Sequence, residues 1–272
     1  LKHFDVAIID EATQILEPQL LGILCARGED GKDAIDKFVL IGDHKQLPAV
    51  VQQNTEQSAI YDESLLSIGL ANLKDSLFER LYRNCTATVH RSYDMLCRQG
   101  RMHPEVALFA NRAFYGGRLI PVGLPHQIES SDTICRLAFY PSVPEKINYS
   151  EARIVADLAA RIYEDHQTDF DESRTLGIIT PYRSQIALIK KEIESLGIPA
   201  LNRILVDTVE RFQGSERDVI IYSFCVNYPY QLKFLSNLTE EEGVLIDRKL
   251  NVALTRARKQ MFITGVPELL ER

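Results

Sequence analysis

The sequence predicts an α/β protein in which helices cover a mainly parallel β-sheet. Short runs of apolar and β-branched residues recur along the chain, and helical patterns separate them. These runs are almost uninterrupted in their apolar character, which is typical of strands covered on both faces. Strand, helix and strand in this rhythm indicate crossover connections between parallel strands.

Seven segments have the composition and the length of strands. They are residues 4–10, 37–43, 134–140, 176–182, 203–209, 218–225 and 260–265. Between them, residues 149–165 repeat apolar side chains with a helical period, and Asn148 and Glu151 are placed for an N-terminal capping box. Residues 184–196 show the same period, and Gly197 supplies the stop.

Length, net charge and hydropathy limit the number of domains and the classes of protein to which this chain can belong. The chain has 272 residues, enough for two medium domains, and we expect these to be residues 1–95 and 96–272. A net charge of −7 argues against a dedicated nucleic-acid coat protein, although a local cleft can still grip a strand. We find no apolar run of the ~20 residues that span a bilayer, so we expect no membrane partner and an intracellular protein, cytoplasmic or nuclear. A bacterial cytoplasm is compatible with this.

Two neighbouring acids end the first predicted strand, in "IIDEATQ" (residues 8–14). An Asp–Glu pair in this place is typical of nucleotide hydrolases. There Asp10 would hold Mg²⁺ through water, and Glu11 would polarise the attacking water. A pair of acids that caps a turn would look the same, so this motif leaves both alternatives open.

The second predicted strand ends in a similar way, in "LIGDHKQLPAV" (residues 40–50). Asp43 follows Gly42, and the polar loop carries Gln46, whose amide can sense whether a γ-phosphate is present. A helix cap at Asp43 followed by a turn that ends at Pro48 is the alternative interpretation.

Six motifs stand in one order along the chain. They are "DEATQ", "GDHKQLP", "QGRMHPEVALFAN", "ITPYRSQ", "VDTVERFQGSERDVII" and "RKLNVALTRAR". Together they resemble superfamily 1 helicases, with the greatest similarity to the branch of the up-frameshift, senataxin and replicative helicase–nuclease proteins. The resemblance covers essentially the whole chain and implies RecA-like, P-loop NTPase-type domains that use ATP and Mg²⁺.

The resemblance assigns roles to the acids and amides of the first predicted domain. Asp10 would be the metal acid and Glu11 the acid that activates water. Asp43 would lie at the nucleotide, and Gln46 would read the γ-phosphate.

In the second predicted domain the resemblance implies two arginines at the phosphates. Arg101, in "RMHP", would approach the γ-phosphate, and Arg256, in "ALTRAR", is similar to an arginine finger. Gln213, Gly214 and Glu216 resemble the segment that links nucleotide to nucleic acid, with Glu216 near the ribose. The fork of a guanidinium group suits phosphate oxygens better than a lysine does.

We expect Arg256 to lie on an amphipathic helix, from which it can project toward a neighbouring domain. The alternative is a solvated arginine or a surface ion pair. His103, in the same motif as Arg101, is expected to be a structural hydrogen-bonding histidine. The inward-facing residues of the predicted helix are Leu250, Ala253, Leu254 and Ala257.

Loops at the ends of strands are expected to hold a single strand of DNA or RNA. Thr180, Pro181 and Tyr182, and then Thr208, offer small hydroxyl groups and an aromatic ring where a phosphate or a base can rest. A tyrosine that packs against the core at a strand end is an equally good interpretation of Tyr182.

Two departures from the family pattern matter. No GxxxxGK[ST] loop occurs in the chain, so the β- and γ-phosphates lack their backbone cradle and lysine. We therefore expect a partial first domain, a complete second domain, a partner in the upstream part of the same polypeptide, and no useful ATP hydrolysis by this chain alone. Gly100 stands where the family commonly has an aromatic residue that stacks on adenine, which removes about 1 kcal/mol of stacking.

Three hypotheses for function follow. The first is the C-terminal part of an ATP-dependent helicase that translocates on single strands and unwinds duplex, 5′-to-3′ as in its relatives. The second is a non-catalytic RecA-like module that binds nucleic acid or protein. The third is an unrelated phosphohydrolase with Asp10 as its nucleophile, which leaves the later motifs unexplained.

Overall fold

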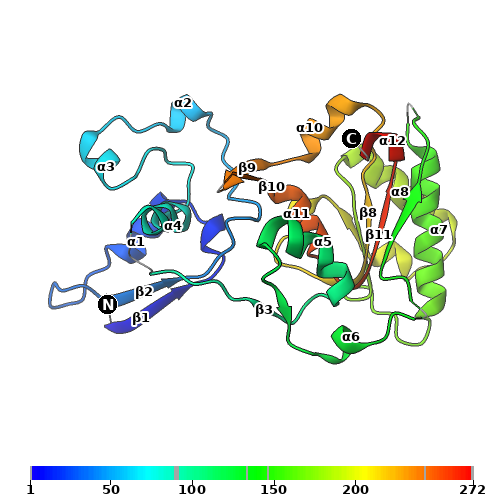
Figure 1. Ribbon diagram of the computed structural model, residues 1–272, viewed down its shortest axis with the longest axis horizontal. Coiled ribbons are helices and arrows are strands. Elements are labelled where there is room, and N and C mark those ends of the chain that lie inside the picture. The colour runs from blue at the N-terminus through cyan, green and yellow to red at the C-terminus, as the bar shows by residue number, and fades with distance from the viewer. Residues whose placement is uncertain (1, 89–91, 133, 146, 242, 271–272) are drawn as a thin grey trace. The chain divides into compact units, whose positions relative to one another are not determined.

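The computed structural model describes residues 2–88, 92–132, 134–145, 147–241 and 243–270. The chain forms two compact units, Leu1–Met95 and Leu96–Arg272 (Figure 1). Each unit is mixed α/β and is built around parallel strands. Among the helices of the described residues, none combines the length and the apolar character that crossing a membrane requires.

The second unit is organised by a five-stranded sheet in the order β5-β11-β8-β6-β7. All of its strand pairs are parallel, as the apolar runs predict. Each strand coincides with a predicted segment, with ends that differ by a few residues. The strands are β5 (Leu137–Pro141), β6 (Leu176–Ile179), β7 (Leu205–Asp207), β8 (Arg217–Ser223) and β11 (Ala257–Gly265).

Helices cover both faces of this sheet. Figure 1 shows α7 (Tyr149–Asp165) and α8 (Arg183–Ser195) on one side of β8 and β11, and α5 (Pro104–Tyr115) and α11 (Arg248–Leu254) on the other. Both predicted helices are therefore present, and Gly197 follows α8 with a φ of +69° that favours glycine. The predicted α/β class with a covered parallel sheet is confirmed.

One apolar core lies between the sheet and the α7–α8 layer. Val155 and Ala159 of α7 and Ile189 of α8 are fully buried against Ile178 and Ile221 of the sheet. Burying a Val or Ile side chain contributes about 1.5–3 kcal/mol, so this layer fixes the sheet on which the predicted site residues stand.

Short elements connect these layers. β9 and β10 form an antiparallel hairpin, and β3 pairs with β4 in parallel. The short elements are β3 (Arg98–Gln99), β4 (Ile120–Pro121), α6 (Pro125–Ile128), η2 (Leu201–Arg203), α9 (Val209–Phe212), η3 (Pro229–Gln231), α10 (Leu232–Leu235), β9 (Leu238–Glu241), β10 (Val244–Asp247) and α12 (Pro267–Leu270).

The first unit contains one parallel strand pair, β1 (Phe4–Ile9) and β2 (Ile35–Leu40). Its helices carry recognisable N-caps: Asn54 caps α2, Asp62 caps α3, and Ser76 and Glu79 form a capping box on α4. The helices are η1 (Ala12–Gln14), α1 (Glu17–Leu24), α2 (Thr55–Ser58), α3 (Glu63–Ser67) and α4 (Leu77–Ala87).

The expectation that β1 and β2 are covered on both faces is wrong for this chain. Phe4 is 54% exposed, Ile8 is 67% exposed and Val39 is 46% exposed. The apolar run predicted the strand correctly, but coverage requires neighbouring strands and helices. Within the described residues, β1 and β2 pair only with each other.

Candidate functional site

The carboxyl ends of β1 and β2 bring four predicted residues to one edge of the first unit. Asp10 and Glu11 follow β1, and Asp43 and Gln46 follow β2. The backbone N–H of Ala12 donates to the carbonyl of Ile41 at 2.8 Å, so the two turns are tied together. This edge of a parallel sheet is where ligands bind in open α/β folds.

Glu11 has an unusual backbone conformation, with a φ of +50°. A left-handed conformation in a residue other than glycine costs about 1–3 kcal/mol. The strained turn is held because Glu11 N–H donates to Asp10 Oδ1 at 2.9 Å and Gln14 Nε2 donates to Glu11 Oε2 at 2.6 Å. Both carboxylates remain exposed, as a water-activating or metal-holding group requires.

Asp43 organises the second turn. It accepts hydrogen bonds from the Lys45 backbone N–H at 3.0 Å and from Gln46 Nε2 at 2.8 Å. Gly42 lies so close to Thr13 that an added Cβ would be 2.9 Å from Thr13 Cγ2, so the close approach requires glycine. The hydrogen bond to Asp43 therefore fixes the orientation of the Gln46 side-chain amide.

Asp10 has the chemistry of a Mg²⁺ ligand. Magnesium prefers carboxylate and water oxygens, and Asp10 Oδ2 accepts no hydrogen bond from any residue that the structure describes. A separate group of potential ligands, at the amino ends of β1 and β2, comprises His3, Asp5 and Asp36, within 4.8 Å of one another. All three are exposed, and the hydrogen bond to Asp36 raises the pKa of His3.

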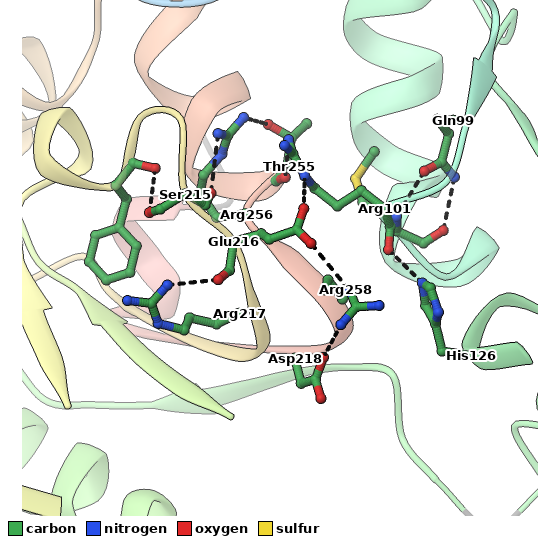
Figure 2. A network of polar contacts seen from close by, with 12 residues as sticks. Gln99, Arg101, His126, Ser215, Glu216, Arg217, Asp218, Thr255, Arg256 and Arg258 are labelled. Atoms are coloured by element: carbon green, nitrogen blue, oxygen red, sulfur yellow. Dashed lines mark hydrogen bonds and ion pairs between the residues drawn. The ribbon is translucent and has the colours of Figure 1, made fainter. Parts of the chain in front are cut away.

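In the second unit, three predicted residues meet at the amino ends of β8 and β11 (Figure 2). Glu216 precedes β8, Arg256 precedes β11, and the backbone N–H of Arg217 donates to the carbonyl of Arg256 at 3.0 Å. Arg101 Nε donates to Glu216 Oε2 at 2.6 Å. Residues far apart in the sequence thus form one polar cluster, which we call the arginine cluster.

Glu216 lies between two arginines. Its other oxygen, Oε1, is 3.4 Å from Arg258 Nε, and Arg258 Nη1 donates to Asp218 Oδ1 at 2.9 Å. Asp218 is buried and also contacts Lys259. Neither Arg258 nor Asp218 is among the residues predicted from the motifs, although Arg258 is the second arginine of "TRAR" and could have been found there.

The main chain around Arg101 is held from both sides (Figure 2). His126 Nε2 is 2.8 Å from the Arg101 carbonyl, and the Gln99 side chain bonds both the N–H and the carbonyl of Met102. His103 is buried and forms the N-cap of α5, as expected of a structural histidine. Arg101 is therefore presented by a rigid backbone, while its side chain remains about one-third exposed.

The prediction that Arg256 lies on the helix is wrong. α11 ends at Leu254, so Arg256 lies in the turn before β11, and the side chain is 2% exposed. Its guanidinium donates to the carbonyl of Val252 at 3.0 Å, to that of Ser215 at 3.4 Å, and to Thr255 Oγ1 at 3.0 Å. At this C-terminus the Thr255 hydroxyl donates to the carbonyl of Asn251 at 2.8 Å.

Gln213 and Gly214 lie in the turn that leads from α9 to the arginine cluster. Gly214 has a φ of +76°, a conformation that side chains rarely adopt. After it, the N–H and the hydroxyl of Ser215 both donate to the carbonyl of Phe212. This turn places the carbonyl of Ser215 against Arg256 and Glu216 beside Arg101.

The predicted strand-binding residues lie at the opposite, carboxyl edge of the same sheet. Thr180 follows β6 and Thr208 follows β7, and Thr180 N–H donates to the carbonyl of Asp207 at 3.1 Å. Thr180 is fully buried. Thr180 Oγ1 and the Tyr182 hydroxyl are buried without a hydrogen-bond partner among the described residues, and burial raises the pKa of Tyr182.

The capping box predicted from Asn148 and Glu151 is wrong. Glu151 is 1% exposed and accepts hydrogen bonds from the hydroxyls of Ser142, Ser223 and Thr264 and from the Cys225 N–H. These donors come from the carboxyl ends of β5, β8 and β11. Spacing alone cannot distinguish a capping acid from a buried one, because this role depends on donors far away in the sequence.

Comparison with known proteins identifies the family. Residues 73–268 match a family described as "AAA domain", and residues 1–54 match a second family with the same description. The first two of the six motifs lie within residues 1–54, and the other four lie within residues 73–268. The chain belongs to the superfamily 1 helicases.

Within this helicase superfamily, the chain belongs to the up-frameshift, senataxin and replicative helicase–nuclease branch. It is 30% identical to the DNA replication ATP-dependent helicase/nuclease DNA2 of Xenopus laevis, over 100% of this chain and 26% of that protein. It is 29% identical to the DNA polymerase alpha-associated DNA helicase A of Saccharomyces cerevisiae, over 99% of this chain and 39% of that protein. The helicase chain thus spans about a quarter to two-fifths of the length of these relatives.

Among solved structures, the helicase chain is similar to the arterivirus nonstructural protein 10, a helicase. The TM-score is 0.44, the identity is 14%, and the match covers 97% of this chain and 40% of that one.

Proposed function

We propose that this chain is part of an ATP-driven motor that moves along single-stranded nucleic acid and unwinds duplex, in the 5′-to-3′ direction of its relatives. The observation that carries the proposal is the arginine cluster. Arg101, Glu216 and Arg256 come from three separate motifs and meet at one end of the sheet in the second unit. An ordinary surface ion pair can form between residues close in the sequence, and it does not need three segments that lie far apart along the chain.

Each side chain of the cluster has a distinct role in the proposed reaction. Arg258 Nε lies within ion-pair distance of Glu216 Oε1, and Glu216 orients Arg101 by accepting a hydrogen bond from its Nε. Among the described residues, the terminal nitrogens of Arg101 have one long contact, 3.5 Å from Nη1 to the carbonyl of Thr255, so they are available to phosphate oxygens. Arg256 would stabilise the charge that develops on the transferred phosphoryl group.

Glu11 and Asp10, in the first unit, carry the acidic groups that the proposed reaction also needs. Glu11 would orient the attacking water and accept its proton. Bound Mg²⁺ would neutralise phosphate charge, and Asp10 would hold it through water. Asp43 directs the amide of Gln46, which would report the presence of the γ-phosphate.

The proposed motor also needs an upstream part of the same polypeptide that carries the phosphate loop. The exposed apolar side chains of β1 and β2 support this, because further strands and helices would bury them. The chain matches only 26% and 39% of the length of two relatives, which also supports a longer polypeptide. We therefore expect this chain alone to hydrolyse ATP little or not at all, and we expect the whole protein to act inside the cell, as enzymes of DNA replication do.

The proposal is tested by nucleic-acid-stimulated ATP hydrolysis of the full-length polypeptide. Glu11→Gln removes the proton acceptor and keeps the shape, so kcat should fall at least about 100-fold. Glu29→Gln, an exposed acid of the same unit, should leave kcat unchanged. Arg256→Lys should lower kcat about 1000-fold. Arg256→Lys is a better test than Arg256→Ala, because the buried guanidinium also donates to the backbone carbonyls of Val252 and Ser215. Full turnover in both Glu11→Gln and Arg256→Lys would refute the mechanism.

Gly100 is the specific observation that favours the second candidate, a binding module without turnover. An added Cβ at Gly100 would meet Leu124 Cδ1 at 3.3 Å, the flexible end of a side chain, so a larger residue can be accommodated. If adenine stacks at this position, Gly100→Tyr should lower the KM for ATP about fivefold, equivalent to about 1 kcal/mol. An unchanged KM would show that the base lies elsewhere.

A further inference from the structure

Two exposed tyrosines stand beyond the carboxyl end of β8, in the segment "NYPYQLKF" (residues 227–234). Tyr228 is 53% exposed and Tyr230 is 61% exposed. Their rings are nearly parallel, with centroids 5.8 Å apart and an interplanar angle of 12°. Nothing in the motifs of the family accounts for them, and exposed apolar side chains that gather in one place mark interaction sites more often than single ones do.

The backbone that carries these rings is held rigidly. The Gln231 Oε1 atom accepts hydrogen bonds from the N–H groups of Asn227 and Tyr228, at 2.8 and 2.9 Å, which closes the turn. Pro229 lies between the two tyrosines and restricts the backbone further. A platform that is already ordered loses little conformational entropy when a ligand stacks on it.

This turn is anchored to the carboxyl edge of the sheet. Cys225, two residues before Asn227, has a φ of +52° and donates its N–H to the buried carboxylate of Glu151 at 3.0 Å. Asn148 Nδ2 contacts Cys225 Sγ, and Gln185 Nε2 donates to the carbonyl of Asn148. Strain of this kind in a residue other than glycine is maintained at functional sites more often than elsewhere.

The platform adjoins the predicted strand-binding loop. Gln185, near the start of α8 after Tyr182, donates to Asn148, and Asn148 contacts Cys225, so the loop and the tyrosine turn are tied together. Burial, and then the neighbouring Cys225 and Tyr230, raise the pKa of Tyr182. Thr180 Oγ1 and the Tyr182 hydroxyl have no partner in the part of the chain that the structure describes. Buried hydroxyls without partners are costly, so this loop holds unused hydrogen-bonding capacity.

Two basic residues without an ion-pair partner among the described residues lie close in sequence to the loop and to the platform. Arg183 begins α8 directly after Tyr182, and Lys233 follows the tyrosine pair in α10. Both are exposed, and neither forms an ion pair with a described residue. Aromatic rings beside basic side chains are the combination with which proteins hold single strands, since bases stack and phosphates pair.

We propose that Tyr228 and Tyr230 form a base-stacking platform for single-stranded nucleic acid, continuous with the loop of Thr180 and Tyr182. The platform rests on the proposed function, because it extends the strand contact of the same unit. Its ligand is a base of either DNA or RNA, since every base has a face that stacks.

Fluorescence anisotropy with the full chain tests the platform directly. The probe is a fluorescein-labelled oligo-dT or oligo-U, longer than the ~16 nucleotides that one such site covers at most. Tyr228→Ala and Tyr230→Ala should each raise Kd roughly 5- to 100-fold, whereas Tyr228→Phe and Tyr230→Phe should keep the affinity within about twofold. Tyr61→Ala, the loss of an 81% exposed tyrosine of the first unit, is the matched control and should have no effect.

Two further readouts separate stacking from charge. The tyrosine variants should leave the dependence of Kd on salt unchanged, whereas Lys233→Ala should reduce the slope by about 0.7. A strand of abasic sugar-phosphate should bind the wild-type chain and both alanine variants equally, because it offers no face to stack on. Retention of fold is checked by an unchanged Tm.

The outcomes decide between the proposals. Unchanged affinity in both alanine variants, an equal loss in Tyr61→Ala, or a loss in the phenylalanine variants would overturn the platform. A wild-type chain that ignores both oligonucleotides but is retained by an immobilised protein would also overturn it. If only the platform fails, ATP hydrolysis by the full-length polypeptide still depends on Glu11 and on single strands. Failure of the proposed function would remove that dependence as well.

Discussion

The two units of this helicase chain contain parallel strands of the same composition in different surroundings. All four residues of β6 and six of the seven residues of β8 are buried, because strands and helices flank them on every side. No residue of β1 or β2 is buried to that degree. The difference shows that an apolar run determines that a segment is a strand, and its neighbours determine whether it is covered.

Two buried glutamates, one in each unit, are stabilised by different means. In the first unit, Glu17 of α1 pairs with both Arg80 Nε and Arg80 Nη2 of α4, at 2.8 and 2.6 Å, and both side chains are about one-tenth exposed. In the second unit, Glu151 receives hydroxyl and backbone donors instead. A buried charge requires either an opposite charge or several hydrogen bonds, and Glu17 and Glu151 each use one of these solutions.

The largest effect is expected from Glu151→Ala, which should lower the free energy of unfolding of the second unit by about 4 kcal/mol. Four hydrogen-bond donors would then lose their buried acceptor. Each donor left unsatisfied costs about 1–3 kcal/mol, and water relieves only part of that cost. Native-state hydrogen exchange at the amides of β8 and β11 measures this. Glu164→Ala, at an exposed position of the same helix, should change the exchange by less than about 0.5 kcal/mol.

The contrast in coverage is tested by truncating one isoleucine in each unit. Ile221→Ala in β8 should cost about 3 kcal/mol, because a fully buried side chain leaves a cavity. Ile8→Ala in β1, where the side chain is 67% exposed, should cost less than about 0.5 kcal/mol. Hydrogen exchange in each strand distinguishes the two, and equal losses would contradict the difference in surroundings.

Glu17→Gln should lower the free energy of unfolding of the first unit by about 2 kcal/mol. The amide keeps one hydrogen bond to Arg80 but leaves the guanidinium charge without its counterion. Exchange at the amides of α4 reports the loss, with the exposed Glu63→Gln as the control. Because the pair is buried, the loss should persist in high salt, and its disappearance there would identify a surface pair instead.

The smallest effect concerns two exposed aspartates, one in each unit, that should behave alike. Hydrogen bonds from the Ser64 side chain and then from the Leu65 and Ser64 backbone lower the pKa of Asp62 below 3.8, and the Ser173 hydroxyl and N–H lower that of Asp171 in the same way. A lowered pKa in the folded state contributes stability above the ordinary pKa, and this is lost as the pH falls through the lowered value. Titration by NMR should place both below ordinary aspartate, and Asp62→Asn and Asp171→Asn should remove the local pH dependence.

Much of the fold could be predicted from local patterns. The helix of residues 149–165 has the bounds of α7, and all seven predicted strands are present with shifted ends. These features depend on the period of apolar side chains, which neighbouring residues determine. The short elements α2 and α3 lie in a polar stretch without such a period, and only their caps at Asn54 and Asp62 indicate them.

The candidate site was less predictable than the fold. The motifs identified Arg101, Glu216 and Arg256, but not Arg258 and Asp218, which orient Glu216 and complete the cluster. The stacked tyrosines Tyr228 and Tyr230 were also missed, since their role depends on exposure and on ring orientation. The assigned catalytic, nucleotide-binding and strand-binding roles stay predictions, to be tested by the variants above.

The sequence by itself determined the strand–helix order, the family, and the residue types at the ends of the strands, because each is written in short segments. Only the tertiary structure decided that Arg256 is buried after its helix, that Glu151 joins three strands and that β1 is exposed. These facts depend on contacts between residues distant in sequence, and the free energy of a polar or apolar side chain is set by what finally surrounds it.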